Sequence, residues 1–310
     1  MKMFDPAITC CYLYLISEYG YPPPVEKTIT YLEETSSMGF SSVELEGIRE
    51  EHLLDVYECR FEIKEALQRL EQTVPYFCVV LQGLSSPDPN ERLENLKLFE
   101  KGCELASFLG AKGVLDNAPL PPYQFLGNSN IERHHDQNTL LSAALPQGLN
   151  WKKYWQGLVE TYKNACDIAG KYGLTNQMHP SAGVLSATAD AFLYFADAVD
   201  SENLRFNFDT SNQFYMKENL GLSLIRLADH IDYIHVSDSH GSKIEHLPPG
   251  EGTVDWENFF NALHTIDFKG HIGIDIGGKE SHVLDIKQAY LDTANWLEQK
   301  WITVTPESKN

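Results

Sequence analysis

The chain has 310 residues, and its 24 Lys and Arg against 44 Asp and Glu give a formal net charge of −20 at pH 7. With 43% hydrophobic and 22% charged residues it can bury a sizeable core, which excludes an intrinsically disordered chain. Nucleic acids and anionic membrane surfaces are bound through Lys and Arg, so the acidic balance argues against both as partners.

The N-terminal stretch and the cysteines favour a cytoplasmic protein. No apolar run in the sequence approaches the roughly 18 residues of a membrane span. The apolar stretch 7–16 follows Asp5 and Pro6 and precedes no small-residue cleavage site, so we interpret it as a first buried strand rather than a signal peptide. The six cysteines form no CxxC motif and no framework spacing, which is typical of reduced thiols.

Short β-prone runs alternate with amphipathic stretches along the chain. The predicted strands cover residues 8–15, 42–46, 76–81, 112–115, 174–178, 204–208, 231–236 and 272–276. The predicted helices cover residues 25–38, 60–72, 90–109, 151–171, 187–199, 220–230, 256–266 and 285–299. Such alternation indicates parallel strands joined by right-handed helical crossovers.

Eight strand–helix pairs in a chain of this length favour an α/β fold of the closed (β/α)8 TIM barrel type. No GxGxxG or GxxxxGK[ST] motif supports a nucleotide-binding open sheet instead. We predict one barrel domain over residues 1–300 and a C-terminal tail at 301–310. The long insertion 118–150 follows the fourth strand, and we interpret it as a lid over the active-site face, with a disordered or oligomer-contacting loop as the alternative.

Polar side chains end the last four predicted strands, at the rim where barrels carry their chemistry. The candidate metal ligands are Gln177, Asp209, His235 and Asp275. Oxygen donors with one imidazole suit Mn²⁺, Mg²⁺ or Co²⁺, and Zn²⁺ is a further candidate. The alternative for each residue alone is that it caps the helix that follows.

The motifs around these residues resemble those of the xylose isomerase-like barrels, a family that includes sugar epimerases, inosose dehydratase and isomerase, and endonuclease IV. The resemblance covers residues 5–300 and is strongest over 176–278. Its motifs are NQMHP at the fifth strand, FNFDTSN at the sixth, DYIHVSDSHGSKIEHLPPGEGTVDWENFFNAL at the seventh, and GHIGIDIGG at the eighth. It implies a divalent-metal-dependent enzyme, with Mn²⁺ as the first expectation.

Two positions depart from the family pattern. The family places a metal-binding glutamate on the fifth and eighth strands, where this chain has Gln177 and Asp275. In the family's epimerases these two glutamates also move a proton across a substrate carbon. Since a neutral amide cannot accept such a proton, we expect a reaction with one base. The candidate catalytic bases are Asp275 and His179, and the alternative for His179 is support of a neighbouring group.

The polar residues predicted to bind substrate hydroxyls lie near the other strand ends and in the loop after the seventh strand. Glu44 and Glu46 share a face by strand alternation, but parity leaves open which face that is. Each predicted contact has a cap or turn role as its alternative. The predicted substrate contacts are Glu46, Gln82, Asn117, Asn212, Asp238 and His246.

Three functions follow as hypotheses. The first is a sugar isomerase or epimerase, favoured because isomerase-like members are the commonest in the family. The second is a lyase of the inosose dehydratase or C-glycoside deglycosidase type, and the third is a non-catalytic sugar-binding subunit. DNA repair is disfavoured, because the histidines that endonuclease IV needs are replaced here by Glu44, Glu46, Gln82 and Asn212. The expected partners are a small sugar, keto sugar or glycoside and further copies of the chain, with a small partner subunit if the protein is a deglycosidase.

Overall fold

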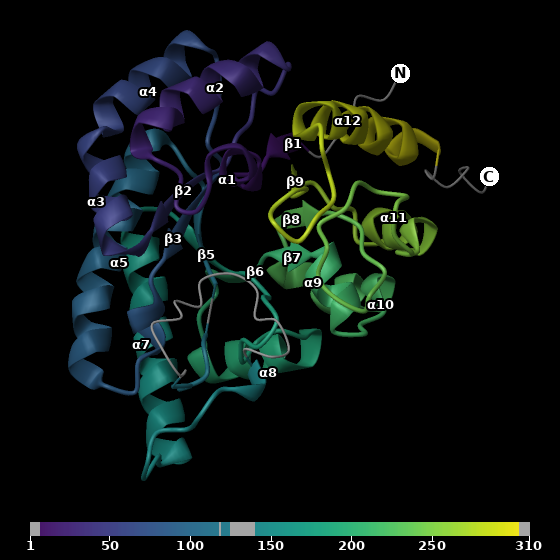
Figure 1. Cartoon of the computed structure of the whole chain (residues 1–310). Helices are drawn as coiled ribbons and strands as arrows, with labels where there is room; N and C mark the ends of the chain where they lie inside the picture. The colour runs from purple at the N-terminus through teal and green to yellow at the C-terminus, as the bar shows by residue number, and fades with distance from the viewer. Residues whose placement is uncertain (1–6, 118, 125–139, 304–310) are drawn as a thin grey trace. The chain divides into compact units, whose positions relative to one another are not determined.

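The computed structural model describes residues 7–117, 119–124 and 140–303 (Figure 1). Part of the predicted lid, residues 118 and 125–139, lies outside this description. The chain forms two compact units. Unit 1 comprises Met1–Leu45, Phe61–Pro75 and Phe206–Asn310, and unit 2 comprises Glu46–Arg60 and Tyr76–Arg205.

Unit 1 contains a parallel sheet whose strand order is β1-β9-β8-β7. These strands are β1 (Ala7–Cys10), β7 (Phe208–Asp209), β8 (Tyr233–Val236) and β9 (His271–Ile274). Asp209 pairs with His235, and His235 pairs in turn with Gly273. Cys10 also pairs with Val43, so the segment that precedes β2 lies alongside β1. The sheet therefore brings segments distant in sequence to one edge.

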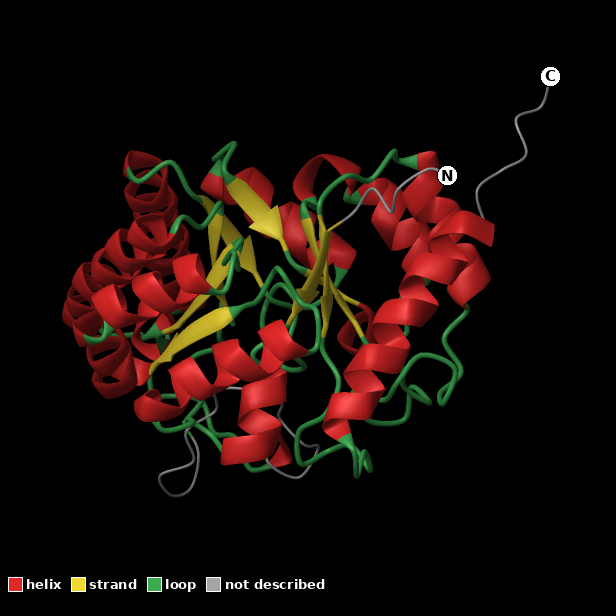
Figure 2. Ribbon diagram, turned by 90° about the horizontal axis from the view of Figure 1, so that it is seen from above, coloured by secondary structure: helices red, strands yellow, loops and turns green. Residues whose placement is uncertain are grey.

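Helices of unit 1 pack against this sheet (Figure 1), and Figure 2 distinguishes helices, strands and loops by colour. Helix α12 contacts β9 and α1, and the rings of Tyr14 and Tyr290 meet edge to face at 5.2 Å. Aromatic pairs of this geometry stabilise a core beyond the area they bury. The elements are α1 (Leu13–Tyr19), η1 (Val25–Lys27), α2 (Thr28–Ser37), α4 (Arg60–Arg69), α9 (Thr210–Tyr215), α10 (Leu220–Arg226), η3 (Ala228–His230), α11 (Trp256–Thr265) and α12 (Ile286–Thr303).

Unit 2 is built around a second parallel sheet with strand order β2-β3-β4-β5-β6. Its strand β3 (Tyr76–Val80) is buried at every residue, as its continuous apolar run YFCVV predicts. The other strands are β2 (Leu45–Ile48), β4 (Gly113–Asp116), β5 (Thr175–Met178) and β6 (Leu204–Phe206), and the helices are α3 (Arg49–Glu58), η2 (Gln82–Ser85), α5 (Pro89–Leu109), α7 (Trp151–Lys171) and α8 (Ala189–Val199).

The predicted α/β architecture with parallel strands is confirmed, and four local predictions are corrected. The first strand ends at Cys10, because the run Leu13–Ile16 forms the buried start of helix α1. An apolar run of this kind fits a buried helix and a buried strand equally well. Helix α3 was not predicted, the sixth strand is divided into β6 and β7, and α12 continues four residues past the helix end predicted at 299.

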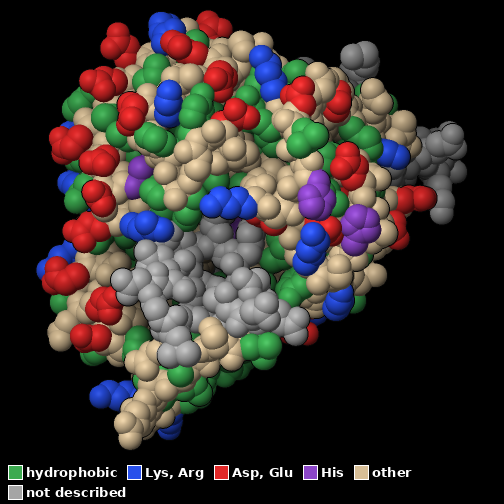
Figure 3. Space-filling model, viewed as in Figure 1, with side chains coloured by type: hydrophobic (Ala, Val, Ile, Leu, Met, Phe, Trp, Pro, Cys, Tyr) green, Lys and Arg blue, Asp and Glu red, His purple; other side chains and the backbone are tan. Residues whose placement is uncertain are grey.

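Acidic side chains are scattered over the face shown in Figure 3, with Lys and Arg between them, rather than gathered in one patch. None of the six cysteines, all of which lie in the described part of the chain, forms a disulfide. Among the described residues, no helix is both long enough and apolar enough to span a bilayer.

Candidate metal centre

Three of the predicted ligands come together at the carboxyl ends of the unit 1 strands. Asp209 is the last residue of β7, His235 lies in β8 and Asp275 follows β9. Their exposed fractions are 0%, 4% and 1%. The strand register places Asp209 beside His235, and the backbone N–H of Asp275 donates to the carbonyl of Val236 at 3.0 Å. Adjacent parallel strands thus bring these side chains to one edge of the sheet, as predicted.

His246, from the loop after β8, joins this cluster. Its Nε2 lies 3.9 Å from Asp209 Oδ2 and 3.6 Å from Asp275 Oδ2. The donor atoms of these three residues all lie within 4.8 Å of one another. Such separations are long for hydrogen bonds but match two ligands of one cation, which are about 3–4 Å apart when each binds at about 2.1 Å. The residues present therefore fit a divalent cation.

A carboxylate holds the other nitrogen of each imidazole. His235 Nε2 lies 3.0 Å from Glu44 Oε2, while its Nδ1 lies 3.6 Å from Asp275 Oδ2. His246 Nδ1 lies 2.8 Å from Glu280 Oε1. Carboxylates in this position fix the ring orientation of metal-binding histidines and raise their basicity. Strand alternation left open which face of the sheet carries Glu44, and the structure places it on the same face as His235.

Charges within the cluster shift its pKa values. Burial opposes protonation of His235, yet the carboxylates of Glu44 and Asp275 hold its pKa well above the ordinary value. Burial also opposes protonation of His246, but its hydrogen bond to Glu280 and the carboxylates of Asp275 and Asp209 raise its pKa. Burial raises the pKa of the nearby Cys11 thiol, so the thiol stays neutral and the carboxylates supply the negative field. A field that favours imidazolium also attracts a divalent cation.

Asp209 serves two partners with its two oxygens. Its Oδ1 accepts a hydrogen bond from the backbone N–H of Asn212 at 2.7 Å and thereby caps helix α9, while Oδ2 faces His246. The capping role given as an alternative therefore coexists with membership of the cluster. The side chains of Ser211, Asn212 and Ser237 are fully buried here and form no hydrogen bond with any described residue. Buried polar groups of this kind call for a polar partner.

Asp238 fixes the loop that carries His246. Its Oδ1 accepts from the N–H groups of Ser239 (2.8 Å) and Val254 (3.1 Å), and its Oδ2 from those of Gly250 (2.7 Å) and the Trp256 ring (3.0 Å). The Asp238 backbone also exchanges two hydrogen bonds with Leu247, of 2.7 and 3.0 Å. The structure thus shows a supporting role for Asp238, and the substrate contact predicted for it stays a prediction.

The remaining predicted site residues belong to unit 2. Gln177 is buried in β5, and its Nε2 donates to Thr175 Oγ1 at 2.9 Å. The backbone N–H of His179 donates to the carbonyl of Asp116 at 2.8 Å. The Asp116 carboxylate accepts from Tyr162 Oη at 3.0 Å, and burial raises its pKa to about 7. Glu46 is buried, and Gln82 and Asn117 are half-buried. The roles of Gln177, His179, Glu46, Gln82 and Asn117 stay predictions.

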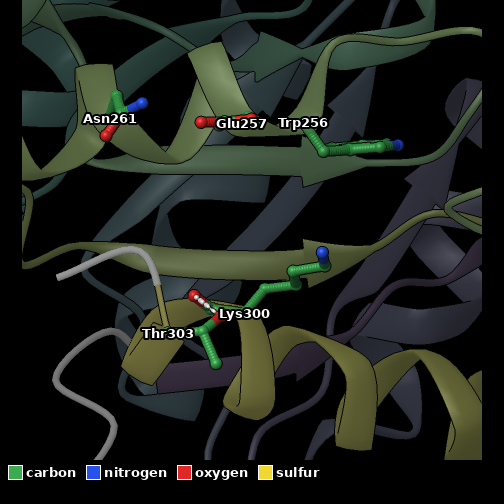
Figure 4. A pocket seen from close by; sticks show the side chains of 5 residues that line it. All are labelled: Trp256, Glu257, Asn261, Lys300 and Thr303. Atoms are coloured by element: carbon green, nitrogen blue, oxygen red, sulfur yellow. Dashed lines mark hydrogen bonds between the residues drawn. The ribbon is translucent and has the colours of Figure 1, made fainter.

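A surface pocket of unit 1 lies between α11 and the C-terminal end of α12, with Trp256, Glu257 and Asn261 on one side and Lys300 and Thr303 on the other (Figure 4). Thr303 Oγ1 donates to the carbonyl of Lys300 at 3.2 Å. The pocket lining includes no residue of the cluster, so this pocket is separate from the candidate metal centre.

Comparisons with known proteins place this geometry in context. A model of the xylose isomerase-like TIM barrel family matches residues 32–300. The 3-dehydro-D-guloside 4-epimerase of Escherichia coli is 22% identical over 282 residues, which cover 89% of this chain and 95% of the enzyme. Inosose dehydratase of Geobacillus kaustophilus is 24% identical over 210 residues, 62% of this chain and 65% of that one. An uncharacterized protein of Methanocaldococcus jannaschii is 26% identical over 163 residues, and the match spans about half of that protein, 53%.

Solved structures show the same fold. The D-allulose 3-epimerase of a Methylomonas species superimposes with a TM-score of 0.74, covering 96% of this chain and 98% of the epimerase, at 18% identity. The predicted fold class is thus supported by both the strand arrangement and a solved relative.

Proposed function

Because the chain belongs to the xylose isomerase-like TIM barrel family, we propose that it is a divalent-metal-dependent enzyme that moves a proton beside the carbonyl of a sugar or polyol. A sugar isomerase or epimerase is the form of this chemistry that we favour. The observation that carries the proposal is the buried cluster of Asp209, His246 and Asp275, whose donor atoms lie within 4.8 Å of one another. Relatives named as sugar epimerases support the substrate class.

The cation that we propose is Mn²⁺, with Mg²⁺, Co²⁺ and Zn²⁺ as alternatives. Asp209, His235 and Asp275 would hold it, and we propose Gln177 as a further oxygen donor. A bound divalent cation supplies a Lewis acid that polarises a substrate carbonyl. With a neutral amide at position 177, this ligand set carries fewer negative charges than the family's set, which has a glutamate at that position.

The chain's own residues supply the proton transfer and the substrate contacts. We propose His179 or Asp275 as the base that takes the carbon-bound proton. Asp275 lies 3.6 Å from both His235 Nδ1 and His246 Nε2, so imidazoles flank its carboxylate on two sides. The buried side chain of Asn212 offers an amide N–H and a carbonyl oxygen to substrate hydroxyls, and Ser211 and Ser237 offer hydroxyl groups.

A lyase is the second candidate, and Gln177 is the observation that favours it. Epimerisation through two opposed carboxylates needs an acid and a base on opposite faces of the substrate, whereas elimination needs one base and a leaving group. A neutral amide on β5 removes one of the two carboxylates. The partial match to an inosose dehydratase is consistent with this alternative.

Solvent deuterium labelling tests the proposal. The metal-stripped protein is reloaded with Mn²⁺ and incubated in D₂O with a panel of keto sugars and 3-keto glycosides, and products are followed by mass spectrometry. Deuterium in a recovered sugar supports isomerase or epimerase chemistry, and loss of a leaving group supports the lyase. The protein without metal and the Asp209→Asn variant are the controls. If Mn²⁺-loaded protein neither exchanges deuterium nor consumes any substrate of the panel, the proposal is wrong for these sugars.

A further inference from the structure

We propose that His246 is a ligand of the bound cation and that Glu280 orients it, so that unit 1 alone supplies two imidazoles and two carboxylates. This inference rests on the proposed metal-dependent function and assigns a role other than the substrate contact predicted from the sequence. The four donors would be Asp209, His235, His246 and Asp275.

The two imidazoles lie at the same distance from one carboxylate oxygen of Asp275. His235 Nδ1 and His246 Nε2 each lie 3.6 Å from Asp275 Oδ2. Each ring is held through its other nitrogen, His235 by Glu44 at 3.0 Å and His246 by Glu280 at 2.8 Å. The family resemblance assigns a ligand role to His235, and the geometry gives His246 the same relation to the same carboxylate oxygen.

The surroundings of His246 Nε2 favour a cation over a substrate hydroxyl. An imidazole whose Nδ1–H is donated to a carboxylate presents a lone pair at Nε2. The carboxylate oxygens of Asp209 and Asp275, at 3.9 and 3.6 Å, face this nitrogen and favour a positive charge there, which either a proton on Nε2 or a cation bound to it supplies. His246 is also fully buried, with an exposed fraction of 0%.

The backbone holds His246 in a conformation that a free loop would avoid. Its φ of +46° lies in the left-handed region, which is disfavoured for a residue with a Cβ. The N–H of Gly277 donates to the His246 carbonyl at 3.1 Å, so the segment that ends in Glu280 binds both the backbone and the ring. Gly277 and Gly278 have φ values of +118° and +77°, and this glycine turn leads from β9 to Glu280. A costly conformation held from two sides indicates a precisely oriented ring.

A ligand set with two imidazoles changes the expected metal preference. Imidazole suits Co²⁺ and Zn²⁺ better than Mg²⁺, whereas a site with oxygen donors and one imidazole is more tolerant of Mg²⁺ and Mn²⁺. We therefore expect the wild-type protein to bind Co²⁺ and Zn²⁺ much more tightly than Mg²⁺. In His246→Ala this difference in affinity should be smaller.

Cobalt titration of the metal-stripped protein tests the assignment, with the visible absorption of bound Co²⁺ as a readout that does not depend on turnover. We expect one Co²⁺ per chain in the wild type. Glu280→Gln should lower the affinity by about 10–100-fold, and His246→Ala should lower it further and change the absorption spectrum. The matched control is His240→Ala, because His240 lies in the same loop, is 52% exposed and is held by Glu245 at 3.1 Å. This control should bind Co²⁺ as the wild type does.

The outcomes separate the inference from the proposed function. If folded His246→Ala and Glu280→Gln proteins bind Co²⁺ with wild-type affinity and spectrum, His246 is not a ligand, although the metal-dependent function stands. If the wild type binds none of the divalent ions, the proposed function fails as well. Should His246→Ala unfold, His246→Gln, which removes the imidazole but keeps most of the side-chain volume, is titrated in its place. Wild-type Co²⁺ affinity and spectrum in both His246→Gln and Glu280→Gln would overturn the inference.

Discussion

The strand ends of the two units handle buried polar groups in different ways. In unit 1, Asp209 and Asp275 are buried beside imidazoles whose other nitrogens are held by carboxylates. In unit 2, Asp116 is buried beside Tyr162 and has its pKa raised to about 7, while Gln177 is neutral. Burying a charge is costly unless an opposite charge or strong donors accompany it. Unit 1 therefore concentrates charge that a cation can balance, whereas in unit 2 burial disfavours the charged form of Asp116 and the side chain at position 177 carries no charge.

The largest expected effect comes from Asp209→Asn, which removes one carboxylate from the unit 1 cluster. The Asn oxygen can still cap α9, so the fold should persist while Mn²⁺ affinity falls by more than about 100-fold. Isothermal titration of the stripped protein measures this. Asp267→Asn, which removes an exposed charge from the same unit, should bind Mn²⁺ as the wild type does. Stoichiometric Mn²⁺ in Asp209→Asn would contradict the assignment of the cluster.

A second prediction tests whether Glu44 supports His235. Glu44→Gln should lower Mn²⁺ affinity by about 10–100-fold, because an amide holds the imidazole less firmly than a carboxylate does. Tyr233→Phe is the graded comparison, since it removes the 2.7 Å hydrogen bond to Glu44 but leaves the carboxylate. We expect a smaller loss for Tyr233→Phe. Equal affinities in the wild type and Glu44→Gln would mean that His235 does not need this support.

A third prediction concerns pH and unit 2. The pKa of Asp116 rises on folding from 3.8 to about 7, so the folded protein retains a proton that the unfolded chain releases. Asp116 therefore lowers the free energy of unfolding as pH rises from about 4 to about 7, and the loss is complete above that range. Asp116→Asn should remove this part of the pH dependence and stabilise the protein at pH 8 by about 1–2 kcal/mol. Urea unfolding at pH 5 and pH 8 measures it.

The control for that measurement is Asp167→Asn, which removes an exposed carboxylate from helix α7 of the same unit. It should leave the pH dependence of unfolding unchanged. If Asp116→Asn shows the same pH profile as the wild type, then Asp116 is not the group that makes unit 2 sensitive to pH.

The smallest expected effect comes from Gln177→Glu, which adds a negative charge to a strand end of unit 2. If Gln177 contributes an oxygen to the cation, as we propose, a third carboxylate should tighten Mn²⁺ binding about tenfold, since ligand charge is a main determinant of affinity for hard cations. The same Mn²⁺ titration detects it. Thr175→Ala removes the present partner of the amide and is the matched control. Unchanged affinity in Gln177→Glu would remove Gln177 from the ligand set.

Regular elements of this chain are readable because local signals mark their ends. Helix α5 begins after Asp88, whose side chain accepts from the N–H of Asn90, and it ends at Gly110 with φ of +95°. Asp209, His235 and Asp275 were predicted because the position at the end of a parallel strand is itself the signal.

The sequence names His246 only as a substrate contact, and the contacts that complete the cluster carry no such signal. His246 sits in a loop without periodicity, and its left-handed backbone and contact with Glu280 depend on a glycine turn more than 30 residues further along the chain. Glu280 carries no motif of its own. The sequence placed Glu44 on a strand but not on a particular face of the sheet. Strand alternation shows which residues share a face, and only packing shows which side of the sheet that face is on. What could not be predicted is therefore long-range, and it consists mainly of the residues that hold the imidazoles.

The four hydrogen bonds to the Asp238 carboxylate have a consequence for how this protein can vary. Three of the four donors are backbone N–H groups, and the fourth is the ring of Trp256. A turn anchored in this way depends on the course of its main chain rather than on the identity of its side chains. Substitutions at exposed loop positions such as His240 and Lys243 should therefore be tolerated. These two positions can then vary to suit the molecules that approach the site without disturbing the turn.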